Sequence, residues 1–444
     1  MPDDGFVQFN KHIIEYMRGV YVLLLISLFG YAGRVGGQES VTITQCYEWA
    51  RANYPQIHQM GLIDQTERYS LSNVGKAWLP QLSVSGKASY QSDVTKLPFD
   101  GDKISSLLPG FEIPSLSKDQ YQVVAQVDQT IWDGGSARSA RALTRAEATA
   151  NRKQLESELY ALNDRVNQLY FGCLLQDELI RQNALLQKEL QVNIERIEAM
   201  MENGVANQSD LESMEVELLN ARQNEIELRA SRTAYRLMLA TFINKPLTDQ
   251  VVLKTPESPE RSLSTQINRP ELRALDAKSE WIETQNKQVT AGLMPRIGAF
   301  VQGGYGRPGL NMLEDSFEPY YVAGVRLSWN LGKLYTLKND RRKIEVSRRQ
   351  TDVQRETFLF NTRLQLLQQN TEIKKMTDLM RADDDIIRLR TSIKQAAEVK
   401  LENGVISVTD LIREINAEDM ARQTAAAHRV QRLMTIYNYM YTTN

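Results

Sequence analysis

The chain contains one sequence pattern twice. The residues Glu202-Asn-Gly-Val-Ala-Asn-Gln-Ser-Asp-Leu211 recur as Glu402-Asn-Gly-Val-Ile-Ser-Val-Thr-Asp-Leu411, and Ala221-Arg-Gln223 recurs as Ala421-Arg-Gln423. Both pairs have the same offset of 200 residues. Because this period is far longer than that of solenoid repeats, the pattern predicts two fused halves of similar structure, not a repeat array.

Each half holds two segments in which apolar and polar residues alternate. They cover residues 82–91 and 123–131 in the first half and 297–305 and 321–331 in the second. Alternation with period two predicts β-strands, and strands of about ten residues are long enough to cross a bilayer when tilted. Aromatic residues near the strand ends would form girdles at the membrane surfaces. The candidates are Tyr90, Tyr305, Tyr321 and Trp329.

Two interpretations of these strands are open. The strands of a soluble sandwich would turn their apolar face into a core, whereas transmembrane strands would turn it toward lipid. We favour the membrane, because the polar faces carry Lys87, Asp128 and Arg326 and because the strands stand between very long helices.

The rest of the chain is predicted to be mostly helical. Residues 137–203 contain no proline, so one unbroken helix there would be about 100 Å long and would need partner helices along its whole length. Apolar residues spaced by four and three form a heptad seam within it. The seam contains Leu155, Leu159, Leu162, Val166, Leu169, Cys173 and Ile180.

Four strands in one chain cannot close a β-barrel, and open sheet edges in lipid would leave backbone groups unpaired. Two copies would give an eight-stranded barrel filled by side chains, whereas three copies would give twelve strands around a lumen. A cyclic trimer is therefore the smallest assembly that makes a conduit. The predicted fold class is mainly α with membrane β, with long coiled-coil-like helices and four transmembrane strands in each protomer.

The N-terminus has the pattern of a secretion signal. Lys11 and Arg18 precede the apolar residues 20–29, and small residues follow up to Gly37. This order predicts a signal peptide. The proline- and charge-rich segment after the first half predicts a connector. The predicted organisation is a signal peptide over 1–37, a first repeat over 38–244, a connector over 245–270 and a second repeat over 271–444.

Composition excludes several classes of function. With 53 Lys and Arg against 55 Asp and Glu, the net charge of −2 offers no general attraction for nucleic acid. Two cysteines and three histidines are scattered, so we predict no metal site, no cofactor and no enzymatic activity. The consecutive acids Asp383-Asp-Asp385 point apart on a helix and are interpreted as a solvated face. Gly304-Tyr-Gly-Arg-Pro-Gly309 opens a loop and not a helix, which argues against a dinucleotide site.

The order of these features resembles the TolC-type outer-membrane efflux protein family, from about Val41 to the C-terminus. The resemblance rests on the helix Ile43-Thr-Gln-Cys-Tyr-Glu-Trp-Ala50 with Asn53-Tyr-Pro55, the strand starts at Pro80 and Pro295, the corner Ile131-Trp-Asp-Gly-Gly135 and the two Glu-Asn-Gly-Val hairpins. Two features depart from the family pattern. The second corner, Trp329-Asn-Leu-Gly-Lys333, is shorter, and the acylated cysteine of many members is absent.

The resemblance implies a homotrimer in the outer membrane of a Gram-negative bacterium, with a twelve-stranded β-barrel in the lipid and a twelve-helix α-barrel through the periplasm. It implies a periplasmic adaptor protein and an inner-membrane transporter as partners. The protein would be a passive duct for the export of small toxic molecules. An outer-membrane duct of a type I polypeptide secretion system shares this architecture and stays open as an alternative. A structural coiled-coil protein of the envelope is an alternative of a different class, which the alternating strands disfavour.

Each repeated hairpin has the composition of a tight helical turn. Gly204 and Gly404 are expected to take positive φ just past a helix end, with Asn207 and Ser407 as N-caps of the returning helices. Exposed tips suit contact with a partner. The predicted adaptor-docking residues are Gly204, Val205, Gly404 and Val405.

The resemblance also implies a constriction. In the family an acidic ring on the second hairpin lines the narrowest part of the helical barrel, and Asp410 stands at the matching position. The next ring position, which can also be acidic, is Arg413 here, close enough to pair with Asp410 and dilute its field. Alternatively, Asp410 completes a capping box with Ser407, as Asp210 does with Asn207, and the two roles are compatible.

Overall fold

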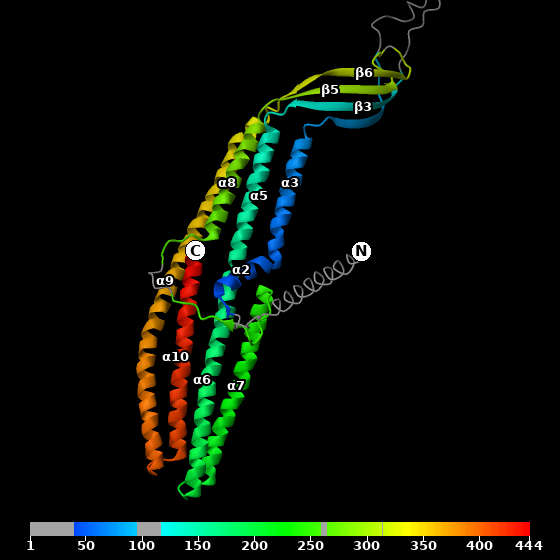
Figure 1. Cartoon of the computed structure of the whole chain (residues 1–444). Helices are drawn as coiled ribbons and strands as arrows, with labels where there is room; N and C mark the ends of the chain where they lie inside the picture. Colours follow the sequence, from blue (N-terminus) through cyan, green and yellow to red (C-terminus); the bar gives the residue numbers. More distant parts are fainter. Residues whose placement is uncertain (1–39, 96–116, 259–263, 313) are drawn as a thin grey trace, which may run out of the picture. The chain divides into compact units, whose positions relative to one another are not determined.

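The computed structural model (Figure 1) describes residues 40–95, 117–258, 264–312 and 314–444. The predicted signal peptide, residues 1–37, lies outside the described residues. The chain divides into two compact units that each draw on distant parts of the sequence. Unit 1 comprises the described residues up to Tyr54, Leu162–Leu263 and Gln369–Tyr441, and unit 2 comprises Pro55–Ala161, Ser264–Gln368 and Thr442–Asn444.

Unit 2 contains a four-stranded antiparallel sheet whose strands cover the four alternating segments. They are β2 (Gln81–Tyr90), β3 (Asp119–Trp132), β5 (Arg296–Arg307) and β6 (Glu318–Ser328), paired in the order β2-β3-β5-β6 (Figure 1). The central pair joins the two halves of the sequence, with Val127 opposite Val301. Within the described residues, β2 pairs only with β3 and β6 only with β5, so both outer edges of the sheet are open.

The apolar face of this sheet is exposed, and its polar face is the more covered one. In β3, Val123 and Val127 are exposed, whereas Gln126 and Asp128, on the other face, are half-buried. Leu82 on β2 is 72% exposed. A sheet of a water-soluble protein shows the opposite arrangement, because large apolar side chains gain free energy by leaving water.

Helices flank the strands of unit 2. They are η1 (Pro55–His58), α3 (Gln59–Lys76), α5 (Ser136–Tyr160), α8 (Pro270–Ala291) and the first part of α9 (Lys333–Glu402), and α5 packs against both α3 and α8. Asp133 makes the corner from β3 into α5, because its carboxylate accepts the backbone N–H groups of Gly135 and Ala137. Gly134 has φ of 66°, and a side chain there would collide with Met294.

Unit 1 consists of long helices and a short strand pair. Its elements are α2 (Ile43–Asn53), α6 (Leu162–Glu202), α7 (Gln208–Ile243), the second part of α9, α10 (Val408–Thr443) and the parallel pair β1 (Ser40–Val41) and β4 (Val252–Leu253). One core gathers around α2, α6 and α7, where Cys46, Tyr170 and Phe171 are buried. A second core joins α6, α7, α9 and α10 near the hairpins. It includes Leu190, Ile197, Met214, Leu401, Leu411 and Ile415.

The stretch expected as one helix over 137–203 forms two consecutive helices, α5 and α6, separated by Ala161. Ala161 keeps helical dihedral angles (φ −60°, ψ −18°) and donates its N–H to the carbonyl of Ser157, so the interruption is limited to one residue. Leu155 and Leu159 in α5 and Val166 and Cys173 in α6 are buried, as the heptad seam predicts. Among the described residues, no helix combines the length and hydropathy that crossing a membrane requires.

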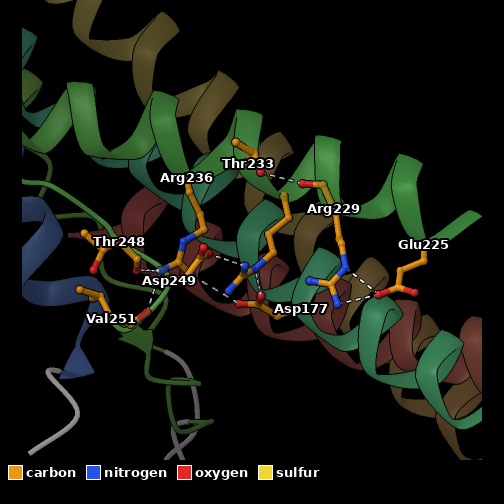
Figure 2. A network of polar contacts seen from close by, with 9 residues as sticks. Asp177, Glu225, Arg229, Thr233, Arg236, Thr248, Asp249 and Val251 are labelled. Atoms are coloured by element: carbon orange, nitrogen blue, oxygen red, sulfur yellow. Dashed lines mark hydrogen bonds and ion pairs between the residues drawn. The ribbon is translucent and has the colours of Figure 1, made fainter.

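Two arginines of α7 fix the start of the predicted connector against the helices of unit 1 (Figure 2). Arg236 is buried and donates to the carbonyl oxygens of Thr248 at 2.6 Å and Val251 at 2.7 Å. Arg232 bridges Asp177 of α6 and Asp249. Burying a guanidinium is costly unless its donors are bonded, so the two bonds from one terminal nitrogen of Arg236 also hold the chain that follows α7 in place, although its Nε is buried without a partner.

Candidate functional site

The first helical hairpin ends in a tight turn made by Gly204. This residue has φ of 73°, its N–H donates to the carbonyl of Met201, and the N–H of Val205 donates to that of Met200. These two bonds form a Schellman motif, which satisfies the last carbonyls of α6 and favours glycine because of the positive φ. The side chain of Val205 is exposed at the tip.

The returning helix α7 begins with a reciprocal cap. Asn207 is the N-cap, and its side-chain oxygen accepts the N–H of Asp210 at 3.1 Å. The carboxylate of Asp210 accepts the N–H of Asn207 at 3.1 Å. The two residues therefore satisfy two helix N–H groups that would otherwise lack partners.

The second hairpin repeats this geometry. Gly404 has φ of 68° and donates to the carbonyl of Leu401, and Val405, which is exposed, donates to that of Lys400. Asp410 donates its N–H to the hydroxyl oxygen of Ser407 at 3.2 Å and accepts the N–H of Ser407 at 3.2 Å. The turn and the cap of each hairpin thus follow from the repeated sequence.

Asp410 differs from Asp210 in its neighbours. The hydroxyl of Ser407 donates to the Asp410 carboxylate at 2.8 Å, and Arg413 lies 3.3 Å from it. The pKa of Asp410 lies below its ordinary value, first because of the bonds from the Ser407 side chain and backbone and then because of Arg413. Asp410 is therefore an ionised, partly exposed carboxylate that takes part in a cap and an ion pair.

A polar cluster within the long helices of unit 1 joins α6, α9 and α10. Lys394 contacts Glu189 and lies 2.6 Å from the carboxylate of Glu418, which also accepts the hydroxyl of Thr391 and a bond from Arg422. Burial works to raise the pKa of Glu418, but the bonds from Lys394, Thr391 and Arg422 lower it overall. Sequence reasoning missed this cluster, because only the spacing of Glu418 and Arg422 by four residues is visible without the helix pairing.

Aromatic residues stand at both ends of the exposed sheet face. Tyr90, Tyr305 and Tyr321 are exposed toward the end where β5 and β6 are joined. Trp329 follows the end of β6 and donates its indole N–H to the carbonyl of Leu293 at 3.0 Å. Trp132, at the end of β3, is exposed as well. Trp132 could not be identified as a girdle residue from the sequence, because the predicted strand ends at residue 131.

The acidic triplet 383–385 and the glycine-rich segment 304–309 form no ligand site in the part of the chain that the structure describes. Asp383, expected on a solvated face, is buried and lies 2.8 Å from His428, whereas Asp384 and Asp385 are exposed and Asp385 pairs with Arg388 on the same helix. In the part of the chain that the structure describes, no three His, Cys, Asp or Glu side chains gather as metal ligands. Gly304 and Gly306 lie inside β5, so the segment expected to open a loop instead continues the strand to Arg307.

Comparisons with known proteins agree with this architecture. Residues 46–245 match the family described as "Outer membrane efflux protein". No curated protein sequence matches the chain. Among solved structures, the outer-membrane channel OprN is 14% identical with a TM-score of 0.64, covering 90% of this chain and 89% of OprN.

Two further structures have the same fold. The open state of the MtrE outer membrane channel of Neisseria gonorrhoeae is 14% identical with a TM-score of 0.62, covering 90% of this chain and 88% of MtrE. The CmeC outer membrane channel of Campylobacter jejuni is 12% identical with a TM-score of 0.61, covering 90% of this chain and 85% of CmeC. Residues 46–245 thus match the outer membrane efflux protein family, and the fold of the chain is that of these outer-membrane channels.

Proposed function

We propose that this protein is the outer-membrane channel of a tripartite export system, a passive duct that carries small molecules to the cell exterior. The observation that carries the proposal is the inverted sheet, in which Leu82, Val325 and their neighbours expose the apolar face. An exposed apolar face of this extent is unfavourable in water and favourable in lipid.

The open edges of the sheet support a homotrimer. Each of β2 and β6 has one paired side within the described residues, and unpaired backbone groups are costly in a bilayer. Three copies, joined from β6 of one protomer to β2 of the next, would form a closed twelve-stranded barrel. The long helices of three copies would continue the duct through the periplasm.

The hairpin tips are the proposed docking sites for a periplasmic adaptor protein, which would link the channel to an inner-membrane transporter. Val205 and Val405 are exposed on turns whose backbones are fixed by glycine. A small apolar side chain on a rigid turn suits a preformed contact. Val405→Asp should abolish drug export in cells while the trimer still assembles. Unchanged resistance would contradict docking at this tip.

Two single substitutions test the topology. A membrane-impermeant maleimide added to intact cells should label Glu314→Cys, in the segment between β5 and β6, and should label Val405→Cys only after the outer membrane is permeabilised. The native thiols add little background, because Cys46 and Cys173 are fully buried and burial raises the pKa of each to about 12. If both introduced cysteines are protected on intact cells, or both are labelled, the proposed orientation is wrong.

A further inference from the structure

Two aromatic residues of the described strands, Phe300 of β5 and Tyr320 of β6, lie on the polar face of the sheet, and the hydroxyl of Tyr320 accepts a bond from Gln122. Phe300 of β5 shares that face with Gln126 and Asp128 of β3 and with Arg326 of β6. In the strand register Asp128 is opposite Phe300, and Phe300 is opposite Gly324. Unlike Tyr320, Phe300 carries no hydrogen-bonding group that would suit a polar face.

Glycine and arginine hold this ring in place. A side chain at Gly324 would approach the ring atoms of Phe300 to 3.1 Å, so the ring lies over the space that glycine leaves open. The guanidinium carbon of Arg326 lies 4.8 Å from the centre of the ring, within the range of a cation–π contact. Arg326 also lies 3.9 Å from the carboxylate of Asp128.

The cation of this group is incompletely neutralised. The Arg326 side chain is 58% exposed, and its ion pair with Asp128, at 3.9 Å, is longer than a hydrogen bond. A hollow of about 570 Å³ beside it is also lined by Arg296 and Lys333. Asp133, another acid of this hollow, is already engaged by backbone N–H groups of the α5 corner. The surroundings of the ring are therefore net positive.

We infer that Phe300 and Arg326 form a selectivity element of the duct that favours anions carrying an aromatic group. The inference rests on the proposed function, because barrel closure would place three copies of the pair around the lumen. The phenyl and guanidinium planes would stack on an aromatic ring of the passing molecule, and the free N–H groups of Arg326 would donate to its carboxylate or sulfonate. The element belongs to the sheet of unit 2, whereas the acidic position Asp410 belongs to the second hairpin of unit 1.

The test uses purified full-length protein in planar bilayers, with 2-naphthalenesulfonate as the probe. Channel block by the probe and the chloride-to-potassium permeability ratio are measured for the wild type, Arg326→Gln, Arg326→Lys and Phe300→Leu. Lys87→Gln is the matched control, because Lys87 is a cation on the same face opposite Gln122, six residues along β3 from Asp128 and so about 20 Å away. Every variant is first checked for its trimeric mass.

Arg326→Gln should weaken block about tenfold and lower the chloride preference. Phe300→Leu and Arg326→Lys should each weaken block about threefold while the chloride preference stays, because they remove stacking but keep the charge. Lys87→Gln should leave block within about a factor of two. Unchanged block in Arg326→Gln and Phe300→Leu, in channels that conduct normally, would overturn this inference alone. A wild type that forms no channels would overturn the proposed function and this inference with it.

Discussion

At the scale of single residues, the two hairpins carry the same cap with different charges around it. Asp210 and Asp410 occupy equivalent positions, but position 213 is serine whereas position 413 is arginine. The capping role is thus shared by both repeats, and the extra ion pair belongs to the second alone. A role of Asp410 in ion selection would have to show itself as a difference between the two aspartates.

We predict that Asp410→Asn and Asp210→Asn lower thermal stability by similar amounts, and that only Asp410→Asn changes cation selectivity in single-channel recordings. Because the pKa of Asp410 is lowered in the folded state, its contribution to stability is complete above the ordinary carboxyl pKa and is lost as pH falls through the lowered value. Melting curves and reversal potentials of both variants provide the measurement. If neither variant alters selectivity, Asp410 is a cap only.

Asp419 predicts a pH effect of the opposite sign. Burial, followed by the neighbouring charges of Glu189 and Glu418, raises its pKa to about 6, while Gln423 and Arg422 work against the increase. The folded state therefore holds a proton that the unfolded state has lost, and stability should fall as pH rises from about 4 to about 6. Asp419→Asn should remove this slope and gain about 1 kcal/mol at pH 7, after discounting for solvent screening. Thermal midpoints at pH 4.5 and 7 check it, with Asp419→Glu expected to keep the slope.

At the scale of elements, local pattern predicted where strands and helices lie and not where they end. The alternation near the second corner continues to Leu331, yet β6 ends at Ser328, because the chain turns into α9 there and Trp329 bonds back to Leu293. The group of Phe300 and Arg326 and the cluster around Lys394 could not be predicted, since each needs the pairing of separate strands or helices. The hairpin caps were predictable because every partner lies within three residues.

Replacing glycine by alanine should lower stability in α6 and raise it in α3. A side chain at Gly172 of α6 would meet the ring of Tyr235 of α7 at 2.6 Å, so Gly172→Ala should destabilise the protein by about 1–2 kcal/mol. Gly61 of α3 has no atom within 4 Å of that position, so Gly61→Ala should stabilise it by about 0.5–1 kcal/mol through helix propensity. Denaturation of the two variants in the same detergent compares them. Equal effects would contradict the close approach of α6 and α7 at Gly172.

At the scale of the whole molecule, the two faces of one strand meet different surroundings, one apolar and one polar. Neighbouring positions of β5 show the division, because Val301 is flanked by Val127 and Ala323 on the apolar face and Gln302 by Gln126 on the polar face. The sequence alone left open whether the apolar face turns toward a core or toward lipid. The exposure of that face in unit 2 favours lipid. A charge introduced at one residue of the strand should therefore have a different effect from the same charge at the next residue.

We therefore predict that Val301→Arg blocks assembly in the outer membrane and that Gln302→Arg does not. A cation at mid-bilayer depth on the lipid face costs about 2–4 kcal/mol in each protomer, and a trimer would bear that cost three times. The same cation at Gln302 would face the lumen, where water and the Asp128 carboxylate can accommodate it. The amount of trimer in the outer-membrane fraction is the measurement, with total expression as its reference. Normal assembly of Val301→Arg would mean that this face does not meet lipid, and failure of both variants would mean that neither face of the strand is open to water.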